Sequence, residues 1–303
     1  MNILVLGGNG FIGSYVVDHL LAAGHSVRVF DRSSERYRSP LSNVDYRLGS
    51  FDDTFLLAEA LQDMDAVCHL ISTTVPGTSN LDPVEDVQSN LVNTLRLLEQ
   101  MRTQGLHRIL YLSSGGTVYG NPVVLPVRED HELNPICSYG VVKVAIEKYL
   151  FMYQQLYGLG PIVLRPSNLY GPRQGHAGLQ GLIGTFLRRM IAGETLEVWG
   201  DGEIVRDYLY IEDLARLCVS AIEKGMTGVF NAGSGEGHSI KDIISTMEEV
   251  AGFETPVQYK KGRVFDVKEV ILDIEQARQY FDWNPQTSLQ EGMAAQLRWL
   301  KTL

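Results

Sequence analysis

The sequence predicts an α/β fold, a doubly wound parallel sheet with a smaller C-terminal α/β domain that binds substrate. Two observations lead to this prediction. A short apolar run, residues 3–6, enters a glycine-rich turn that opens a helix-like segment. Strand and helix signals then alternate as far as residue 112. This alternation is typical of a Rossmann-type parallel sheet with helices on both faces.

The composition limits the class of protein. The chain has 303 residues, 45% of them hydrophobic and 20% charged, which fits one large or two closely joined globular domains. The formal net charge of -10 argues against binding nucleic acid or an anionic membrane. No apolar run reaches the roughly 18 residues that span a bilayer. Cys68, Cys137 and Cys218 lack metal-ligand spacing and indicate a reducing compartment. We therefore expect a cytoplasmic protein without a metal site.

The first motif is the glycine turn that follows residues 3–6. Gly7 permits a tight turn, Gly10 lets a pyrophosphate approach the backbone, and Gly13 lets the helix pack close to the strand. Free amides and the dipole at a helix N-terminus favour anions. We expect this turn, including Phe11 and Ile12, to bind a dinucleotide. Its spacing is one residue wider than that of the commonest dinucleotide fingerprint.

The second predicted strand, residues 27–30, ends in Asp31, 18 residues after Gly13. A carboxylate at this position can accept hydrogen bonds from both hydroxyls of an adenosine ribose and would repel a 2′-phosphate. Asp31 therefore favours NAD over NADP, although the neighbouring Arg32 would soften this preference.

The next predicted strands are residues 44–48, 66–71 and 108–112, with helices over 54–62 and 84–102. Ligands of such sheets bind beyond the carboxyl ends of the strands. The polar residues at these strand ends are Ser72, Thr73, Thr74, Ser113 and Ser114. Of these, Ser113 is predicted to contact the cofactor, as is Asn90 on the intervening helix.

Tyr139 and Lys143 are four residues apart at the start of a predicted helix, so their side chains share one face. A free tyrosine has a pKa of about 10 and is a poor base at neutral pH. A nearby ammonium group stabilises the phenolate and lowers this pKa. The pair therefore predicts a proton shuttle.

The motifs from residue 3 to about residue 290 resemble, in order and spacing, the extended short-chain dehydrogenases/reductases. Within them the chain is most similar to the NAD-dependent nucleotide-sugar epimerases and dehydratases, and its pattern is that of UDP-hexose 4-epimerases. Besides the glycine turn and the Tyr139–Lys143 pair, the resemblance rests on residues 112–120 (LSSGGTVYG), 165–173 (RPSNLYGPR), 205–213 (VRDYLYIED) and 263–266 (RVFD).

The resemblance implies the roles of individual residues. Tyr139 would be the active-site base, and Lys143 would bind the nicotinamide ribose and depress the pKa of the tyrosine. The implied substrate contacts are Asn168 to the sugar nucleotide, Arg206 and Arg263 to the diphosphate, and Asp266 to the nucleoside ribose. A planar guanidinium group can bind two phosphate oxygens at once, which supports the two arginines.

The resemblance also implies the reaction. The base takes the proton of the C4 hydroxyl while C4 passes hydride to NAD, and the 4-keto sugar then turns over and receives hydride on its other face. The chain departs from the family at Gly115, where a serine or threonine usually binds the substrate hydroxyl. Ser114 or Thr117 would replace it, with Thr117 preferred, and Ser114 is equally a candidate cofactor contact.

A second departure bears on the type of reaction. The 4,6-dehydratases of the superfamily carry an Asp-Glu pair where this chain has Gly116 and Thr117. Without carboxylates, elimination lacks its acid and base, so epimerisation is favoured. A nucleotide-sugar decarboxylase, a 4-keto reductase and an inactive NAD-binding regulator remain as alternatives.

The sugar stays open between UDP-GlcNAc/GalNAc, UDP-Glc/Gal and UDP-GlcA/GalA. By resemblance, Val270 stands where epimerases that exclude N-acetyl sugars carry a tyrosine, so its small side chain would admit an N-acetyl group. Arg173 or Arg188 would meet the carboxylate of a glucuronate.

Two domains are expected. Residues 1–165 plus 204–233 would form the NAD-binding domain, and residues 166–203 plus 234–303 the nucleotide-sugar-binding domain. Apolar stripes on the helices near residues 84–103 and 139–157 suggest an intersubunit helix bundle, as in similar homodimers. Burial inside one subunit is the competing explanation for these stripes.

Overall fold

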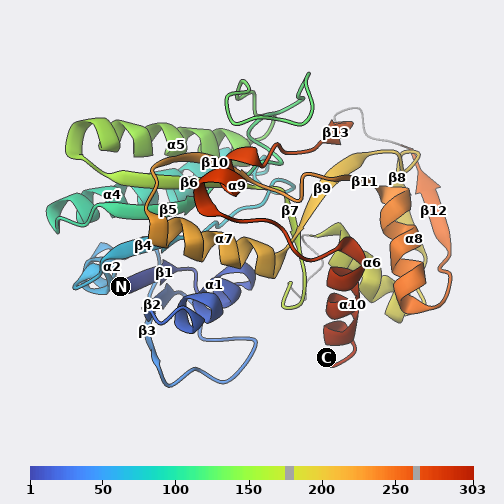
Figure 1. Cartoon of the computed structure of the whole chain (residues 1–303), viewed down its shortest axis with the longest axis horizontal. Helices are drawn as coiled ribbons and strands as arrows, with labels where there is room; N and C mark the ends of the chain where they lie inside the picture. Colours follow the sequence, from blue (N-terminus) through green and yellow to red (C-terminus); the bar gives the residue numbers. More distant parts are fainter. Residues whose placement is uncertain (175–180, 262–266) are drawn as a thin grey trace.

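A seven-stranded sheet in the order β10-β6-β5-β4-β1-β2-β3 forms the larger part of the molecule (Figure 1). The structure, a computed structural model, describes residues 1–174, 181–261 and 267–303. Every strand pair in this sheet is parallel, and the order reverses at β1, which lies between β4 and β2. The predicted doubly wound sheet is therefore confirmed.

The strands of the chain are β1 (Asn2–Leu6), β2 (Ser26–Asp31), β3 (Val44–Leu48), β4 (Ala66–His69), β5 (Arg108–Leu112), β6 (Gly160–Pro166), β7 (Asn168–Tyr170), β8 (Leu196–Trp199), β9 (Val205–Tyr210), β10 (Gly228–Ala232), β11 (Gly237–Ser239), β12 (Val257–Lys260) and β13 (Glu269–Val270). The helices are α1 (Phe11–Ala22), α2 (Thr54–Leu61), α3 (Pro83–Asp86), the π-helical η1 (Val87–Val92), α4 (Asn93–Thr103), α5 (Ser138–Tyr157), α6 (Leu182–Ile191), α7 (Ile211–Lys224), α8 (Ile240–Ala251), α9 (Glu275–Phe281) and α10 (Leu289–Leu300).

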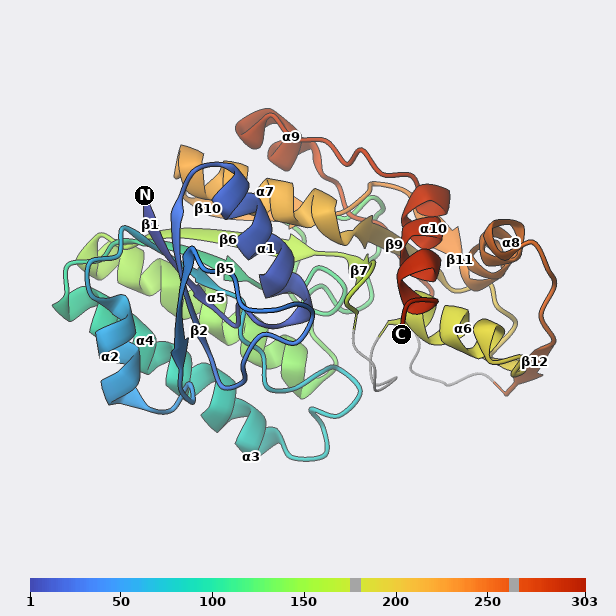
Figure 2. The same ribbon diagram turned by 90° about the horizontal axis from the view of Figure 1, so that it is seen from below.

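The side chains of the central strand β1 alternate between the two faces of the sheet. Leu4 and Leu6 belong to the apolar core beneath α2, α4 and α5, whereas Ile3 and Val5 belong to the core beneath α1 and α7. Figure 2 shows these helix layers on opposite faces of the sheet. Both faces are covered, so the residues of β1 are apolar throughout the buried part of the strand.

A smaller lobe lies beyond one end of the sheet (Figures 1 and 2). In it, β9 pairs with β7, β11 and β13, and β8 pairs with β12, while α6, α8 and α10 pack beside these strands. The return segment near residues 204–233 thus divides: β9 joins the small sheet, and β10 joins the large one. The division into an NAD-binding domain and a sugar-binding domain stays our proposal.

The helix predicted over residues 84–102 is interrupted. The backbone forms α3, then the wider turns of η1, then α4. Such π-helical turns occur frequently at functional sites, and η1 carries Asn90 towards the carboxyl end of β4. The apolar periodicity of the sequence does not reveal this change of helix type.

None of the helices in the described ranges is both long and apolar enough to cross a membrane.

Candidate active site

A cleft of about 840 Å³ lies at the carboxyl ends of the central strands. Its walls come from the turn after β1, the end of β2, the segment after β4, and the helical region around η1. The residues that line it include Gly7, Gly10, Asp31, Arg32, Ser72 and Ser89. The structure therefore brings together the glycine turn and the acidic strand end that the sequence predicted as parts of a dinucleotide site.

The glycine turn has the geometry that a pyrophosphate site requires. Gly10 is the N-cap of α1, and no side chain caps the amides of the first helical turn, which includes Phe11 and Ile12. A Cβ atom on Gly13 would lie 2.1 Å from the carbonyl oxygen of Gly7, so only glycine permits this packing. These amides stay open to an anion, and a dinucleotide fits the turn. The contacts themselves remain predictions.

Asp31 is buried beside this turn. Its carboxylate accepts hydrogen bonds from the backbone amide of Asn9 and from the amide and hydroxyl of Ser33, each at 3.1 Å. The carboxylate is thereby held at the wall of the cleft. This position suits the predicted role of accepting ribose hydroxyls. Arg32 also lines the cleft, as does Arg36.

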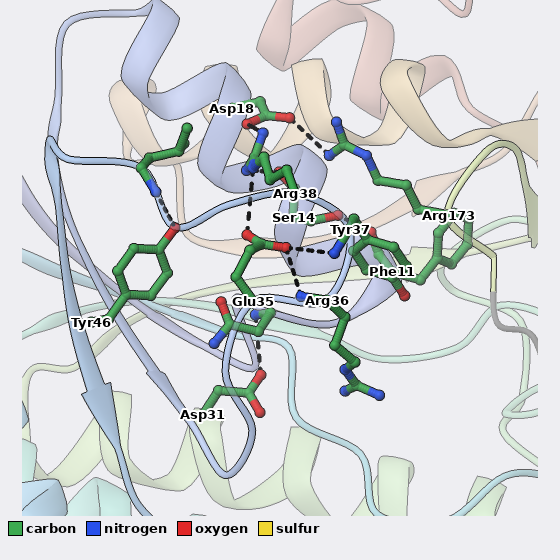
Figure 3. Close-up of polar contacts among 12 residues, drawn as sticks. Phe11, Ser14, Asp18, Asp31, Glu35, Arg36, Tyr37, Arg38, Tyr46 and Arg173 are labelled. Atoms are coloured by element: carbon green, nitrogen blue, oxygen red, sulfur yellow. Dashed lines mark hydrogen bonds and ion pairs between the residues drawn. The ribbon is translucent and has the colours of Figure 1, made fainter. Parts of the chain in front are cut away.

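Figure 3 shows Asp18 of α1 between two arginines from distant parts of the chain. One is Arg38, in the loop after β2, and the other is Arg173, which donates a hydrogen bond of 2.8 Å to Asp18. The guanidinium carbon of Arg173 lies 4.4 Å from the ring centroid of Tyr15. Arg173 is thus held by α1, and the prediction that it meets a substrate carboxylate is not supported.

Tyr139 and Lys143 face the same small cavity at the start of α5, as predicted from their spacing. The Lys143 ammonium lies 5.4 Å from the ring centroid of Tyr139 and 4.8 Å from that of Tyr111. It donates a hydrogen bond of 2.8 Å to the carbonyl oxygen of Leu112, at the end of β5. The sheet therefore fixes the ammonium beside the tyrosine ring.

The pKa of Tyr139 does not follow the prediction. Burial raises the pKa of Tyr139 to about 12, and hydrogen bonds with Ser72 and Ser114 lower it only in part. Burial also lowers the pKa of Lys143 to about 8, while the nearby carboxylates of Glu147 and Asp86 act in the opposite direction. The expected net lowering of the tyrosine pKa is therefore wrong, because burial is the dominant influence.

The structure distinguishes the two hydroxyls proposed to replace the one missing at Gly115. Ser114 lies close to Tyr139, and its hydroxyl lowers the pKa of the tyrosine. The hydroxyl of Thr117 is buried and has no hydrogen-bond partner in the described part of the chain. On this geometry we favour Ser114 over Thr117, and the role of either hydroxyl stays a prediction.

The side chain of Ser113 is used within the protein, and its predicted cofactor contact stays a prediction. It is buried, and its hydroxyl donates a hydrogen bond to Glu147. Glu147 in turn forms an ion pair of 2.6 Å with Arg165 of β6, and Arg165 donates to the hydroxyl of Tyr119 at 2.9 Å. The sequence interpretation missed this buried network. The position of Glu147, one helical turn after Lys143, was the available signal.

Asn90 lines the cavity beside Tyr139, but its amide group is used within the protein. Its Oδ1 accepts from the amide of Thr73 at 2.9 Å, and its Nδ2 donates to Thr73 and to Asp86. Asn90 thus ties the segment after β4 to η1. A direct cofactor contact by its side chain stays a prediction.

Two of the predicted substrate residues, Asn168 and Arg206, lie on the paired strands β7 and β9 of the smaller lobe. Asn168 of β7 donates to the carbonyl oxygen of Asp207 at 3.1 Å, and Arg206 of β9 donates to that of Val205 at 2.8 Å. Arg263 and Asp266 lie outside the described residues. The contacts of these four side chains with a sugar nucleotide remain predictions.

Comparison with known proteins identifies a matching family and several similar proteins. Residues 3–233 match the NAD dependent epimerase/dehydratase family. A UDP-glucose 4-epimerase of Mycolicibacterium smegmatis is 35% identical over 304 residues, 97% of this chain and 96% of the relative. The crystal structure of a UDP-glucose 4-epimerase from Thermotoga maritima with UDP-glucose is 36% identical, covers 100% of this chain and 99% of that one, and has a TM-score of 0.95.

A third relative extends the range of sugars. It is a UDP-glucuronic acid 4-epimerase from Bacillus cereus, solved in complex with UDP-glucuronic acid and NAD, with 29% identity and a TM-score of 0.90 over 100% of this chain and 99% of that one. The predicted resemblance, the fold class and NAD as cofactor are confirmed. This chain belongs to the NAD dependent epimerase/dehydratase family.

Proposed function

We propose that this protein is an NAD-dependent 4-epimerase of UDP-hexoses. One observation carries the proposal: Tyr139 has Lys143 over its ring and the hydroxyl of Ser114 close by, beside the cleft lined by the glycine turn and Asp31. This arrangement supports the proposal of a proton carrier next to a dinucleotide site. NAD, when bound there, supplies the hydride acceptor and donor that inversion at C4 needs.

The residues of the chain would perform the proton chemistry. Tyr139 takes the proton of the C4 hydroxyl, and Ser114 orients that hydroxyl by sharing its hydrogen bond. Lys143 stabilises the phenolate by its charge. Its hydrogen bond to Leu112 keeps the ammonium in place through the reaction, so no reorganisation of charge is needed.

Elimination and decarboxylation are less well supported. Residues 115–117 include no carboxylate. The space around residue 115 is also filled, because a Cβ on Gly115 would lie 2.9 Å from the carbonyl oxygen of Arg165. Residue 115 thus packs closely against β6, and the neighbouring Ser114 offers Tyr139 a hydroxyl group rather than an acid.

The first sugar to test is UDP-glucose, since the relatives from Mycolicibacterium smegmatis and Thermotoga maritima are UDP-glucose 4-epimerases. Val270 is buried in β13 and opposite Arg206 of β9. Its small side chain supports UDP-GlcNAc as a second substrate. UDP-glucuronate has weaker support, because Arg173 is held by Asp18.

We also propose a homodimer that forms through α4 and α5, which lie side by side on one face of the sheet (Figure 1). Val141, Met152 and Leu156 of α5 are 52%, 40% and 61% exposed. These residues follow helical spacing along the outer face of α5. A second copy of the chain would cover this apolar stripe.

The test of the function is NMR of UDP-glucose, UDP-GlcNAc and UDP-glucuronate, each incubated with pure protein and NAD. Inversion at C4 is expected for at least one sugar. In Tyr139→Phe the turnover should fall about 10²- to 10⁴-fold, the usual contribution of a positioned acid–base group, while NAD still binds. No change in any sugar would reject the proposal. Release of CO₂, or stoichiometric consumption of NADH, would indicate a decarboxylase or a reductase instead.

A further inference from the structure

Asp86, the last residue of α3, is completely buried, and three segments of the chain meet at its carboxylate. Its Oδ1 accepts from the hydroxyl of Thr74 at 2.7 Å and from the amide of Asn90 at 2.9 Å. Its Oδ2 accepts from the hydroxyl of Ser138 at 2.7 Å. The carboxylate therefore joins the segment after β4, the π-helical η1 and the first residue of α5.

The same carboxylate lines the cavity that Tyr139 and Lys143 face. Within the described ranges, no lysine, arginine or histidine forms an ion pair with it, and Lys143 is the cation whose charge it influences. A carboxylate buried without an adjacent cation is costly. The presence of this buried carboxylate at the wall of the site indicates a function beyond packing.

The backbone around Tyr139 indicates that this function is to position the start of α5. The N-cap residue of α5, Cys137, forms no side-chain cap. The amide of Ser138 donates instead to the side chain of Asn80 at 2.8 Å, and that of Tyr139 donates to the hydroxyl of Ser79 at 3.1 Å. The N-terminus of the catalytic helix is thus capped by the segment between Thr74 and Asp86.

We propose that Asp86 is a positioning residue for Tyr139: by binding Thr74, Asn90 and Ser138 together, it holds residues 74–86 against the N-terminus of α5. The inference rests on the proposed function, in which Tyr139 is the base. Asp86 does not need to touch the substrate. It acts by positioning Tyr139 and the residues that cap the N-terminus of α5.

A change to asparagine would disturb this junction. An asparagine side chain carries one acceptor oxygen and one donor NH₂ group. If the amide oxygen of the asparagine faces Thr74 and Asn90, its NH₂ group faces Ser138, and the Ser138 hydroxyl must turn from donor to acceptor. All three hydrogen bonds also lose the charge of the acceptor, so the junction is weaker in Asp86→Asn.

The change would also alter the charge near Tyr139. The titratable groups around its ring and hydroxyl are Asp86 of α3, Cys137 before α5, Lys143 of α5 and Tyr111 of β5. The negative charge of Asp86 raises the pKa of Tyr139. Its removal lowers this pKa, so the limb of the pH–rate profile that requires the phenolate moves to lower pH.

The experiment compares Asp86→Asn with Asp213→Asn. Asp213 is also completely buried and accepts hydrogen bonds from the amides of Gln286 and Thr287, at 2.9 and 3.1 Å, but lies on α7 away from Tyr139. In Asp86→Asn, hydrogen–deuterium exchange of the amides of residues 137–143 should become about tenfold faster. Asp213→Asn should leave exchange at 137–143 unchanged.

With UDP-glucose, kcat of Asp86→Asn should fall about tenfold or more with KM changed less than threefold, and the pH limb should shift downwards. Unchanged exchange at 137–143 in Asp86→Asn, or a wild-type kcat and pH profile, would overturn the proposal. If the wild-type protein turns over no sugar nucleotide, the proposed function fails, and the exchange experiment still decides whether Asp86 positions the helix.

Discussion

Arg165 of β6 binds Glu147 of α5 through two hydrogen bonds, 3.1 Å from Nε to Oε1 and 2.6 Å from Nη2 to Oε2. Both side chains are almost fully buried. Glu147 lies one helical turn after Lys143, so the pair fixes α5 against the sheet. The same guanidinium group donates to the hydroxyl of Tyr119 and the carbonyl oxygen of Glu129.

Glu147→Gln should lower the free energy of unfolding by about 3–5 kcal/mol, because the change leaves the charge of Arg165 buried and unpaired. Urea unfolding at pH 7 measures this loss. Asp130→Asn is the control: Asp130 forms an ion pair with Arg128, but both side chains are mostly exposed. The control should change stability by less than about 1 kcal/mol. Equal effects of the two changes would contradict the role of the buried pair.

Ser114→Ala should lower kcat about 10- to 100-fold, the effect of removing a hydrogen bond that positions a reacting group. Thr117→Val should change kcat less than about threefold and should not lower stability, since the buried hydroxyl of Thr117 has no partner to lose among residues 1–174, 181–261 and 267–303. Steady-state kinetics with UDP-glucose compares the two. A large loss of kcat in Thr117→Val alone would instead support Thr117 as the hydroxyl that binds the substrate.

Gly115→Ser should not recreate a family-like active site. A Cβ at residue 115 would lie 2.6 Å from Cδ1 of Leu272 and 2.9 Å from the carbonyl oxygen of Arg165, so the backbone must move. We expect a loss of about 1–3 kcal/mol in stability, typical of overpacking. The neighbouring Gly116→Ser is the matched control, as its Cβ would meet no atom closer than 4.0 Å. Melting temperatures of the two variants should differ clearly.

His69 should make the protein sensitive to acid. Burial lowers the pKa of His69 to about 3, with a smaller effect from the charge of Lys143. Its Nε2 lies 2.9 Å from the hydroxyl of Thr94, and its Nδ1 has no partner among the described residues. Between pH 6.5 and 3 the unfolded chain binds a proton that the folded chain excludes, so stability falls as pH falls through this window.

The slope contributed by His69 should approach about 1.4 kcal/mol per pH unit below pH 6.5. Urea unfolding at pH 7.0, 6.0 and 5.0 measures it, with His69→Gln as the variant that lacks the titrating group. The variant is less stable at pH 7, yet its stability should depend less on pH. Parallel pH profiles for the two proteins would show that another group causes the acid sensitivity.

Leu156→Glu should convert the proposed dimer to monomer, since a charge would be placed in the apolar stripe of α5. Sedimentation equilibrium at micromolar concentration is the measurement. Phe253→Glu, at an exposed aromatic residue of the smaller lobe, should keep the mass of the wild-type protein. A wild-type protein that sediments as a monomer would reject the dimer.

The sequence predicted those parts of the fold that depend on local pattern. The limits of β3 (Val44–Leu48) and β5 (Arg108–Leu112) agree with the predicted strands, since short β-branched and apolar runs between turns are a local signal. The spacing of Tyr139 and Lys143 was equally local, and the structure places both on one face of α5.

Long-range contacts could not be predicted. The hydrogen bond between Asp86 and Ser138 joins residues 52 positions apart, and that between Arg173 and Asp18 joins residues 155 apart. Neither has a pattern in its own segment. The raised pKa of Tyr139 was missed for a related reason: the degree of burial is a property of the assembled site.

The order of strands in the large sheet has a consequence for synthesis of the chain on the ribosome. Strands β1 to β6 have all been made by residue 166, but β10, which covers the outer edge of β6, ends at residue 232. Until then the edge that carries Ile162, Val163 and Leu164 has no neighbour. Unpaired apolar edges promote aggregation. The nascent chain is therefore most exposed to aggregation during the interval in which α7 and β10 emerge.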